Sequence, residues 1–242
     1  MDFGEISGGV RMRVCGYNKT TLLDYPEHVA ATVFVGGCNF RCPFCQNSDL
    51  VLRPEVQPAI RETEILGFLE KRKGILTGVC LTGGEPTLAA GLGEFIRKVK
   101  EMGYLVKLDT NGYRPEILRG LLSAHLLDYI AMDVKNSMER YGETVGDASV
   151  DTGRIRESVH IIMESGISYE FRTTVVKELH GEKEITAIGR EVEGADKYFL
   201  QSYRDSEGVM KAGFHACERN ELERFAECVR PYVGGVWLRG VD

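Results

Sequence analysis

The sequence lacks a long apolar run, an excess of basic residues and any low-complexity tract. No apolar run reaches the ~18 residues that a membrane-spanning helix needs, so we expect no membrane span. The 30 Lys and Arg residues are outnumbered by 36 Asp and Glu, which gives a net charge of −6. A protein that binds nucleic acid through its phosphates shows a basic stripe instead, so we expect no nucleic-acid partner.

The chain starts with an acidic, glycine-rich stretch and not with a basic segment followed by an apolar one. It is therefore unlike a secretory signal, and we interpret residues 1–14 as an N-terminal extension of a cytoplasmic protein. Because no Pro- or Ser-rich linker interrupts the rest, we expect one barrel over residues 15–204. A C-terminal helix and strand, 205–242, are expected to pack on that barrel.

Six runs rich in apolar and β-branched residues predict strands that are covered on both faces. These runs are 29–36, 78–82, 104–109, 128–134, 169–176 and 197–202. Amphipathic stretches predict helices over 62–72, 91–102, 114–124, 151–165, 181–193 and 219–230, with a short strand at 236–238. Alternating strands and helices are typical of parallel βαβ units, and six such units predict an α/β protein with a partial (β/α)6 barrel.

Short polar motifs follow five of the six strands. They are Gly36–Cys38, Thr82–Pro86, Asp109–Gly112, Asp133–Lys135 and Gln201–Arg204. In a parallel barrel all carboxyl ends of the strands share one face, and active sites are built there. We therefore expect these five motifs to contribute to one site.

Three of the seven cysteines lie within eight residues, as Cys38, Cys42 and Cys45 in a C-x3-C-x2-C motif. In a reducing compartment this pattern indicates a metal site and not a disulfide framework. Three thiolates on one loop can hold three corners of an iron–sulfur cubane, whose fourth iron stays open to a small ligand. A structural zinc site with a fourth ligand from elsewhere is the alternative, although zinc sites usually pair two such hooks and no second hook is present.

Taken singly, several of these residues have ordinary explanations. The stretch Asp109–Gly112 has the composition of a turn. Lys135 alone would be a solvated lysine, and Cys80, between Val79 and Leu81, is expected in the core. Arg172 lies inside an apolar strand, where a buried arginine needs a partner.

Two motifs together resemble the radical S-adenosylmethionine (SAM) superfamily. They are the cysteine motif, with Phe44 before its last cysteine, and the Gly-Gly-Glu-Pro run at 83–86. Other segments resemble a narrower group, the activating proteins of anaerobic ribonucleoside-triphosphate reductase, which belong with the glycyl-radical-enzyme activases. These segments are the stretch 21–47, and later 170–176 and 201–204.

The resemblance implies a partial TIM-like radical SAM barrel with one [4Fe–4S] cluster on Cys38, Cys42 and Cys45, and with SAM on the fourth iron. It implies that reductive cleavage of SAM yields a 5′-deoxyadenosyl radical, which generates a glycyl radical on a partner glycyl radical enzyme. A flavodoxin- or ferredoxin-type protein would donate the electron. No catalytic residue beyond the cluster and SAM is implied, because the cofactors carry the hard chemistry.

The resemblance also implies contacts to SAM. These are Phe44 beside the adenine, Gly83 and Gly84 along the methionine, Glu85 at its ammonium group, Asp109, Thr110 and Asn111 at the ribose or methionyl end, Lys135 and Arg172 at its carboxylate, and Arg204 in the place of a histidine of the pyruvate formate-lyase activase. As in that activase, Asp109, Thr110 and Asp133 are expected to hold a monovalent cation.

Two other functions stay open at this point. The chain is short, has no second cysteine cluster, and leaves little room for an insertion over 46–62, which favours the activase. A radical SAM enzyme that acts directly on a small molecule or on another macromolecule is the first alternative. A zinc or iron–sulfur module without catalysis is the second, and the polar strand ends argue against it.

Overall fold

The computed structural model describes residues 12–206 and 208–241, which form two compact units. The described part of the first unit comprises 12–39, 49–110 and 119–129, and the second unit comprises the remaining described residues. Of the expected N-terminal extension, 1–14, residues 1–11 lie outside the described part. The expected division at residue 204 stays a prediction, and residues beyond it belong to the second unit.

The first unit contains the strands β1 (Val14–Thr21), β2 (Ala30–Val35), β3 (Gly78–Gly83) and β4 (Leu105–Thr110), in that order. β2, β3 and β4 are parallel, whereas β1 runs antiparallel to β2. The helical elements of this unit are α2 (Glu62–Glu70), α3 (Leu92–Glu101) and the short helices η1 (Pro54–Val56) and η2 (Pro86–Leu88).

The strand β4 has one apolar and one mixed face, because side chains alternate along a strand. On β4, Val106 and Leu108 are fully buried on the apolar face, and α3 packs near this strand. Lys107 and Asp109 alternate with them and share the mixed face. Lys107 and Asp109 therefore bring charged groups to the carboxyl end of β4, although the mostly apolar strand sequence does not indicate a face that is exposed to solvent.

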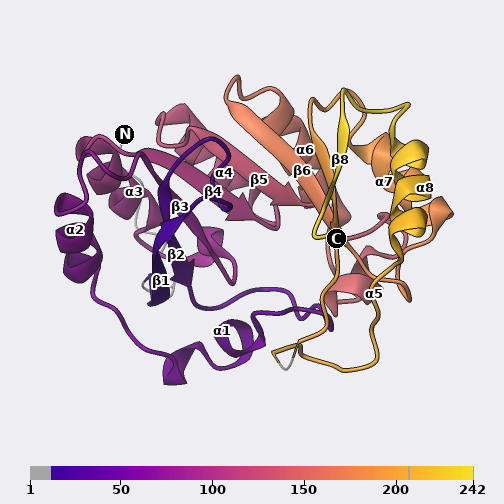
Figure 1. Ribbon diagram of the computed structural model, residues 1–242, viewed down its shortest axis with the longest axis horizontal. Coiled ribbons are helices and arrows are strands. Elements are labelled where there is room, and N and C mark those ends of the chain that lie inside the picture. The colour runs from indigo at the N-terminus through magenta and orange to yellow at the C-terminus, as the bar shows by residue number, and fades with distance from the viewer. Residues whose placement is uncertain (1–11, 207, 242) are drawn as a thin grey trace. The chain divides into compact units, whose positions relative to one another are not determined.

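The second unit contains β5 (Tyr129–Asp133) from its second residue onward, β6 (Ser168–Val175), β7 (Tyr198–Ser202) and β8 (Val236–Arg239), in that order. β6, β7 and β8 are parallel. Its helices are α5 (Tyr141–Val145), α6 (Thr152–Met163), α7 (Glu182–Glu191) and α8 (Arg219–Val229). Figure 1 shows α7 and α8 side by side next to β8.

Two further helices, α1 (Ser48–Leu52) and α4 (Pro115–Ser123), have residues in both units. All six predicted strands and six predicted helices are confirmed, as is the short strand β8. The sequence analysis missed β1, α1 and α5. The longest helix of the described residues is α6, with 12 residues, and no helix among them has the length and apolar character to cross a membrane.

Candidate functional site

The three cysteines of the C-x3-C-x2-C motif lie on the loop that follows β2. None of the three forms a disulfide; Cys42 is buried, and Cys38 and Cys45 are half-buried. The amide of Cys45 donates a hydrogen bond to the carbonyl of Cys42, 3.0 Å away, so these two residues form a turn. Cys38 belongs to the first unit and the other two belong to the second, but only seven peptide bonds separate the outer pair.

In the first unit, the start of this loop is held by the Gly-Gly-Glu-Pro segment. The amide of Gly84 donates to Val35 O at 2.8 Å, and the amide of Glu85 donates to Gly37 O at 2.7 Å. A Cβ atom on Gly84 would lie 2.0 Å from Gly37 O, and one on Gly83, whose φ is +116°, would lie 2.5 Å from Val35 O. Gly84 is thus required by the approach of the cysteine loop, and Gly83 by the end of β2 and by its own positive φ.

In the second unit, Phe40 and Arg41 anchor the middle of the loop. Phe40 is buried, and its ring packs edge-on against Tyr113 and Tyr141, with centroids 5.4 and 6.3 Å apart. The amide of Arg41 donates to Val145 O at 2.8 Å. The loop between the first two cysteines is therefore fixed by packing as well as by backbone hydrogen bonds.

Phe44, which the resemblance places beside the adenine of SAM, lies in an aromatic cluster. Its ring is 5% exposed and contacts Tyr203 and Phe214, each with a centroid 6.5 Å away. The preceding Pro43 accepts a hydrogen bond from the amide of Lys211 at 2.9 Å. The segment after β7 thus covers the end of the cysteine loop, and a contact of Phe44 with adenine stays a prediction.

Glu85 is a buried carboxylate with several hydrogen-bond donors. Its Oε1 accepts from the amide and hydroxyl of Thr87, at 3.1 and 2.5 Å, and from the Thr110 hydroxyl at 2.7 Å. The side chain is 1% exposed. These bonds join η2 to the end of β4, so Glu85 orders the first unit's strand ends; its predicted contact with the SAM ammonium group is untested.

Asp109 forms an ion pair with Lys107, two residues earlier on β4. The Lys107 side chain is 2% exposed and that of Asp109 is 13% exposed. Asn111, at the start of the next turn, accepts a hydrogen bond from the Tyr113 amide at 3.0 Å, which is the turn role that its composition favoured. The sequence analysis did not single out Lys107, although strand alternation places it on the face of Asp109.

In the second unit, Asp133 at the end of β5 lies between two cations. Arg172 Nε is 2.8 Å from Asp133 Oδ1, and Lys135 Nζ is 3.2 Å from Oδ2. Burial alone would raise the pKa of Asp133, but Arg172 and then Lys135 outweigh it and hold that pKa well below its usual range. The simple interpretation of Lys135 as a solvated lysine is wrong, since it is 17% exposed, and the expectation of a partner for Arg172 is confirmed.

The ammonium group of Lys135 also acts on the cysteine loop. Burial raises the pKa of the Cys42 thiol to about 11, and the charge of Lys135 partly counteracts this. Although burial lowers the pKa of Lys135, Asp133, Cys42 and Cys45 raise it, and the net shift is upward. Two cysteines, one carboxylate and two cations of the second unit therefore form one electrostatically coupled group.

Arg204 lies after β7, and its side chain is exposed. Its carbonyl oxygen accepts a hydrogen bond from Gln46 Nε2 at 2.7 Å, which ties this segment to the residue that follows Cys45. The backbone of Arg204 is therefore positioned by the cysteine loop. A role of its guanidinium in SAM binding is untested.

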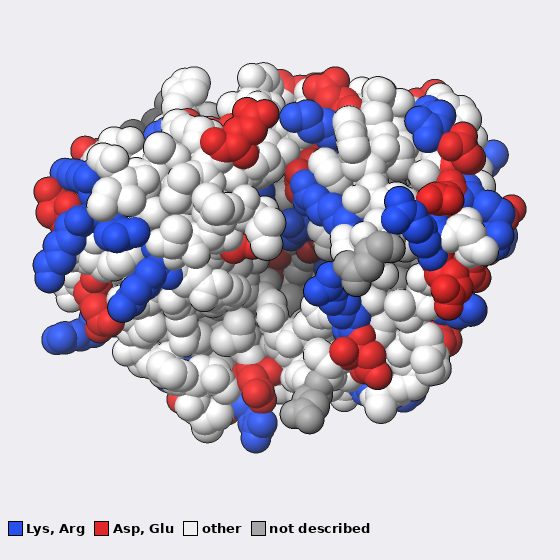
Figure 2. All heavy atoms as spheres, in the orientation of Figure 1, with Lys and Arg blue, Asp and Glu red and all other residues white. Residues whose placement is uncertain are grey.

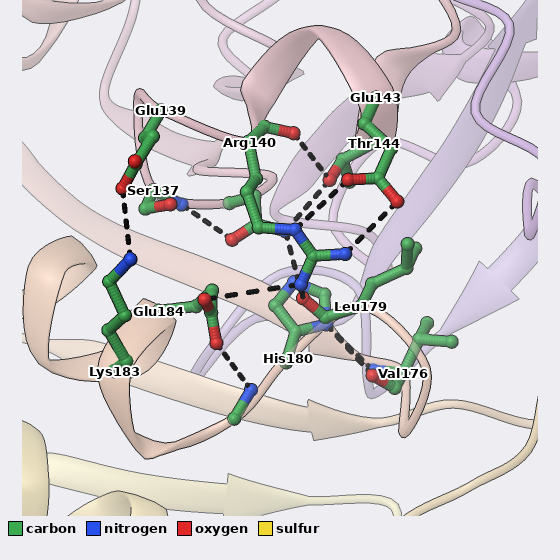
Figure 3. Close-up of polar contacts among 12 residues, drawn as sticks. Ser137, Glu139, Arg140, Glu143, Thr144, Val176, Leu179, His180, Lys183 and Glu184 are labelled. Carbon is green, nitrogen blue, oxygen red and sulfur yellow. Dashed lines mark hydrogen bonds and ion pairs between the residues drawn. The ribbon is translucent and has the colours of Figure 1, made fainter.

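A buried histidine that carries no sequence motif connects the loops after β5 and β6 (Figure 3). Val176 N donates to His180 Nδ1 at 3.0 Å, which places the imidazole proton on Nε2, 2.9 Å from Lys135 O. Burial lowers the pKa of His180. Beside it, Arg140 donates to Leu179 O at 2.8 Å. This network fixes the backbone of Lys135, and only the fold reveals it.

The donor set fits an iron–sulfur cluster. Three thiols share one loop, and the Lys135 cation near two of them, Cys42 and Cys45, suits an anionic cluster with thiolate ligands. Among the described residues, no three His, Cys, Asp or Glu side chains form a site for a single metal ion. This does not argue against a cubane, because each thiolate there binds a different iron and the ligands lie farther apart.

Residues 32–186, more than half of the chain, match the radical SAM superfamily, and the chain belongs to this superfamily. Its members use a [4Fe–4S] cluster and SAM, which confirms the expected cofactors. Which residues hold them, and whether a monovalent cation is bound at Asp109, Thr110 and Asp133, is not tested by this match.

The chain is 29% identical over 236 residues to a Methanocaldococcus jannaschii protein that carries the provisional name glycyl-radical enzyme activating enzyme, and the match covers 95% of this chain and 96% of that one. It is 28% identical over 161 residues to the 7-carboxy-7-deazaguanine synthase of Thermococcus kodakarensis, with 59% and 62% covered.

Among solved structures, Streptococcus suis SuiB bound to S-adenosylmethionine has a TM-score of 0.67 at 18% identity. The match covers 84% of this chain and 48% of SuiB, so the chain spans about half of that protein. This likeness confirms the predicted α/β fold class, a partial (β/α)6 TIM-like radical SAM barrel.

Proposed function

We propose that this radical SAM enzyme is an activase that generates a glycyl radical on a partner glycyl radical enzyme. The observation that supports this most is the likeness to a protein named as such an activating enzyme, which runs over nearly the full length of both chains. The match covers 95% of this chain and 96% of that one.

In this proposal, Cys38, Cys42 and Cys45 ligate the cluster, and residues at the carboxyl ends of strands bind SAM. When bound, the reduced cluster supplies the electron that cleaves SAM to a 5′-deoxyadenosyl radical able to remove a hydrogen atom. The chain itself orients and shields these groups. The Gly83–Glu85 backbone holds the start of the cysteine loop, and Phe40 and Phe44 pack its remainder against buried rings.

Lys135 and Arg172 are proposed to bind the SAM carboxylate. Together with Asp133 they carry a net charge of +1, so the group retains attraction for an anion after the internal ion pairs form. Their side chains are 17% and 14% exposed, which strengthens that attraction because water screens it little. Glu85, Asp109, Thr110 and Asn111 are proposed to bind the remaining polar groups of SAM, and Arg204 to lie at its edge.

A flavodoxin- or ferredoxin-type protein is the proposed electron donor, and the cytoplasm is the proposed location. None of the seven cysteines, all of which lie among the described residues, forms a disulfide, which fits a reducing compartment. Figure 2 shows Lys and Arg side chains interleaved with Asp and Glu over the face drawn, and the whole chain has a net charge of −6. This charge pattern supports a protein partner over a nucleic acid.

A radical SAM enzyme that acts directly on a small molecule or other macromolecule is the second candidate. The match to 7-carboxy-7-deazaguanine synthase favours it, because that relative is named for the synthesis of a small molecule. That match covers 59% of this chain, against 95% for the activating enzyme. The longer match is why we prefer the activase.

The test is electron paramagnetic resonance on the reduced, SAM-loaded protein mixed with the glycyl radical enzyme encoded nearest to it. We expect a partner-borne organic radical whose splitting collapses when the partner carries α-deuterated glycine. A mixture without a partner radical, in which a free small molecule is consumed instead, would move the assignment to the second candidate. The Cys42→Ala variant is the matched negative control.

A further inference from the structure

The mixed face of β4 carries a lysine for which the function described above has no use. Lys107 is 2% exposed, and its ammonium group forms an ion pair with Asp109. Lysine is almost never fully buried unless it is paired, because removing an ammonium group from water is costly. Its retention at the centre of a parallel sheet therefore calls for a function that an apolar residue could not fulfil.

The surroundings of Lys107 leave Asp109 as its main partner. In the strand register, Thr32, Cys80 and Lys107 lie next to one another across β2, β3 and β4. The ammonium group is 3.9 Å from Cys80 Sγ and 5.8 Å from the centroid of the Tyr129 ring, and both are weak interactions. The strong contact is the one to the carboxylate at the carboxyl end of the strand, where the proposed SAM site lies.

Tyr129 also belongs to the apolar cluster that lies beyond the ammonium group. This cluster consists of Tyr25, Ala30 and Tyr129, with Leu105 packed against it. Lys107 therefore extends from an apolar environment toward a single carboxylate. That arrangement fixes the direction of the Asp109 carboxylate.

We propose that Lys107 is a positioning residue: its ammonium group is a built-in counter-ion that takes the place of a free monovalent cation beside Asp109. This inference rests on the proposed function, in which Asp109 binds SAM. The other two residues expected to hold a cation also have protein partners, since Thr110 donates to Glu85 and Asp133 pairs with two cations. SAM binding by this chain is then independent of potassium and sodium.

The test is isothermal titration of SAM into the anaerobically reconstituted protein, in potassium, sodium or choline chloride at equal ionic strength. Wild type is expected to have the same affinity in all three salts. Lys107→Met is expected to lose about 10- to 100-fold in choline, the range for a hydrogen bond to a charged group. Part of that loss should return with potassium or ammonium ions, which can enter the vacated space.

Lys100→Met is the matched control, because Lys100 is also paired with a carboxylate in the first unit, that of Asp128. It is expected to bind SAM like wild type in every salt. Iron content and circular dichroism report whether each variant folds and carries its cluster. If Lys107→Met does not fold, the double variant with Asp109→Asn removes both charges, and the salt dependence of wild type still decides the question.

Wild-type SAM affinity that requires potassium or sodium overturns the inference, and so does a Lys107→Met protein that binds SAM at full strength in choline. Unchanged SAM affinity in Asp109→Asn is a different failure, because it removes Asp109 from the SAM site on which the proposed function relies. Weak SAM binding by Asp109→Asn, together with salt-independent SAM binding by wild type, supports both the place of Asp109 in the SAM site and the role of Lys107 as its counter-ion.

Discussion

Replacing Gly84 by alanine is expected to destabilise the protein through one identifiable contact. The added Cβ would lie 2.0 Å from the carbonyl oxygen of Gly37 and 2.7 Å from its carbonyl carbon. Atoms in contact normally lie about 3.5 Å apart, so one of the two backbones must move by more than ~1 Å. The φ of Gly84 is not positive, so alanine is conformationally allowed and the cost comes from the contact.

The magnitude has two parts. Overpacking of a buried position costs about 1–3 kcal/mol. The displacement also breaks the 2.7 Å hydrogen bond from Glu85 N to Gly37 O, at about 0.5–1.5 kcal/mol. Together these predict a loss of about 1.5–4.5 kcal/mol, which a protein stable by about 5–15 kcal/mol survives. The variant should fold, but the residue before Cys38 is displaced and the cluster loads poorly.

Urea unfolding of the iron-free protein measures the first effect, and iron per chain after anaerobic reconstitution measures the second. Gly67→Ala is the matched control, since Gly67 lies within α2 with open space where its Cβ would be. There, alanine is expected to stabilise by about 0.5–1 kcal/mol. A Gly84→Ala protein that is as stable as wild type and fully loaded with iron would refute the reasoning.

Three further predictions follow from the site. Cys42→Ala should lose the iron bound on reconstitution and the absorbance of the cluster, whereas Cys228→Ala, outside the cysteine loop, should keep both. Full iron content in Cys42→Ala would exclude Cys42 as a cluster ligand. Because the pKa of His180 is lowered, its contribution to stability is lost as the pH falls below about 6.5. His180→Gln should flatten that dependence in urea titrations, unlike the exposed control His160→Gln, and an unchanged slope would contradict this. Asp133→Asn, which strands two cations, should cost about 3–5 kcal/mol at pH 7. The cost should shrink below pH ~3.9, where the wild-type carboxylate loses its own contribution, and an equal cost at low pH would argue against the ion pairs.

The helices and strands that could be predicted from the sequence are those whose apolar residues form a regular pattern or a continuous run. The strand Ala30–Val35 has five buried residues of six, so its near-continuous apolar run reflects burial of both faces. β1, Val14–Thr21, was missed because only its first two residues are buried and it lies at the edge of the sheet, next to β2. A half-polar edge strand has no period that distinguishes it from a loop.

The candidate site shows the same limit. Sequence spacing located the cysteine motif and the strand ends, because these are contiguous in the chain. Lys107 was overlooked because it lies in an apolar run. Asp109 is recognised as its partner only when the alternation of side chains along a strand places both residues on the same face. The role of His180 could not have been found, since Lys135, 45 residues earlier in the chain, reaches it only through the fold. The role of Gly84 likewise depends on a backbone far away in sequence.

The central claim is that the hydrogen atom removed by this enzyme comes from a glycine of another protein. Mass spectrometry of the 5′-deoxyadenosine formed from SAM tests it most directly, with a glycyl radical enzyme partner that carries α-deuterated glycine. The account predicts one deuterium in the 5′-deoxyadenosine when the labelled partner is present, and none when the partner's glycines are unlabelled. Unlabelled 5′-deoxyadenosine in the presence of the labelled partner, with deuterium instead acquired from a labelled small molecule, would contradict it.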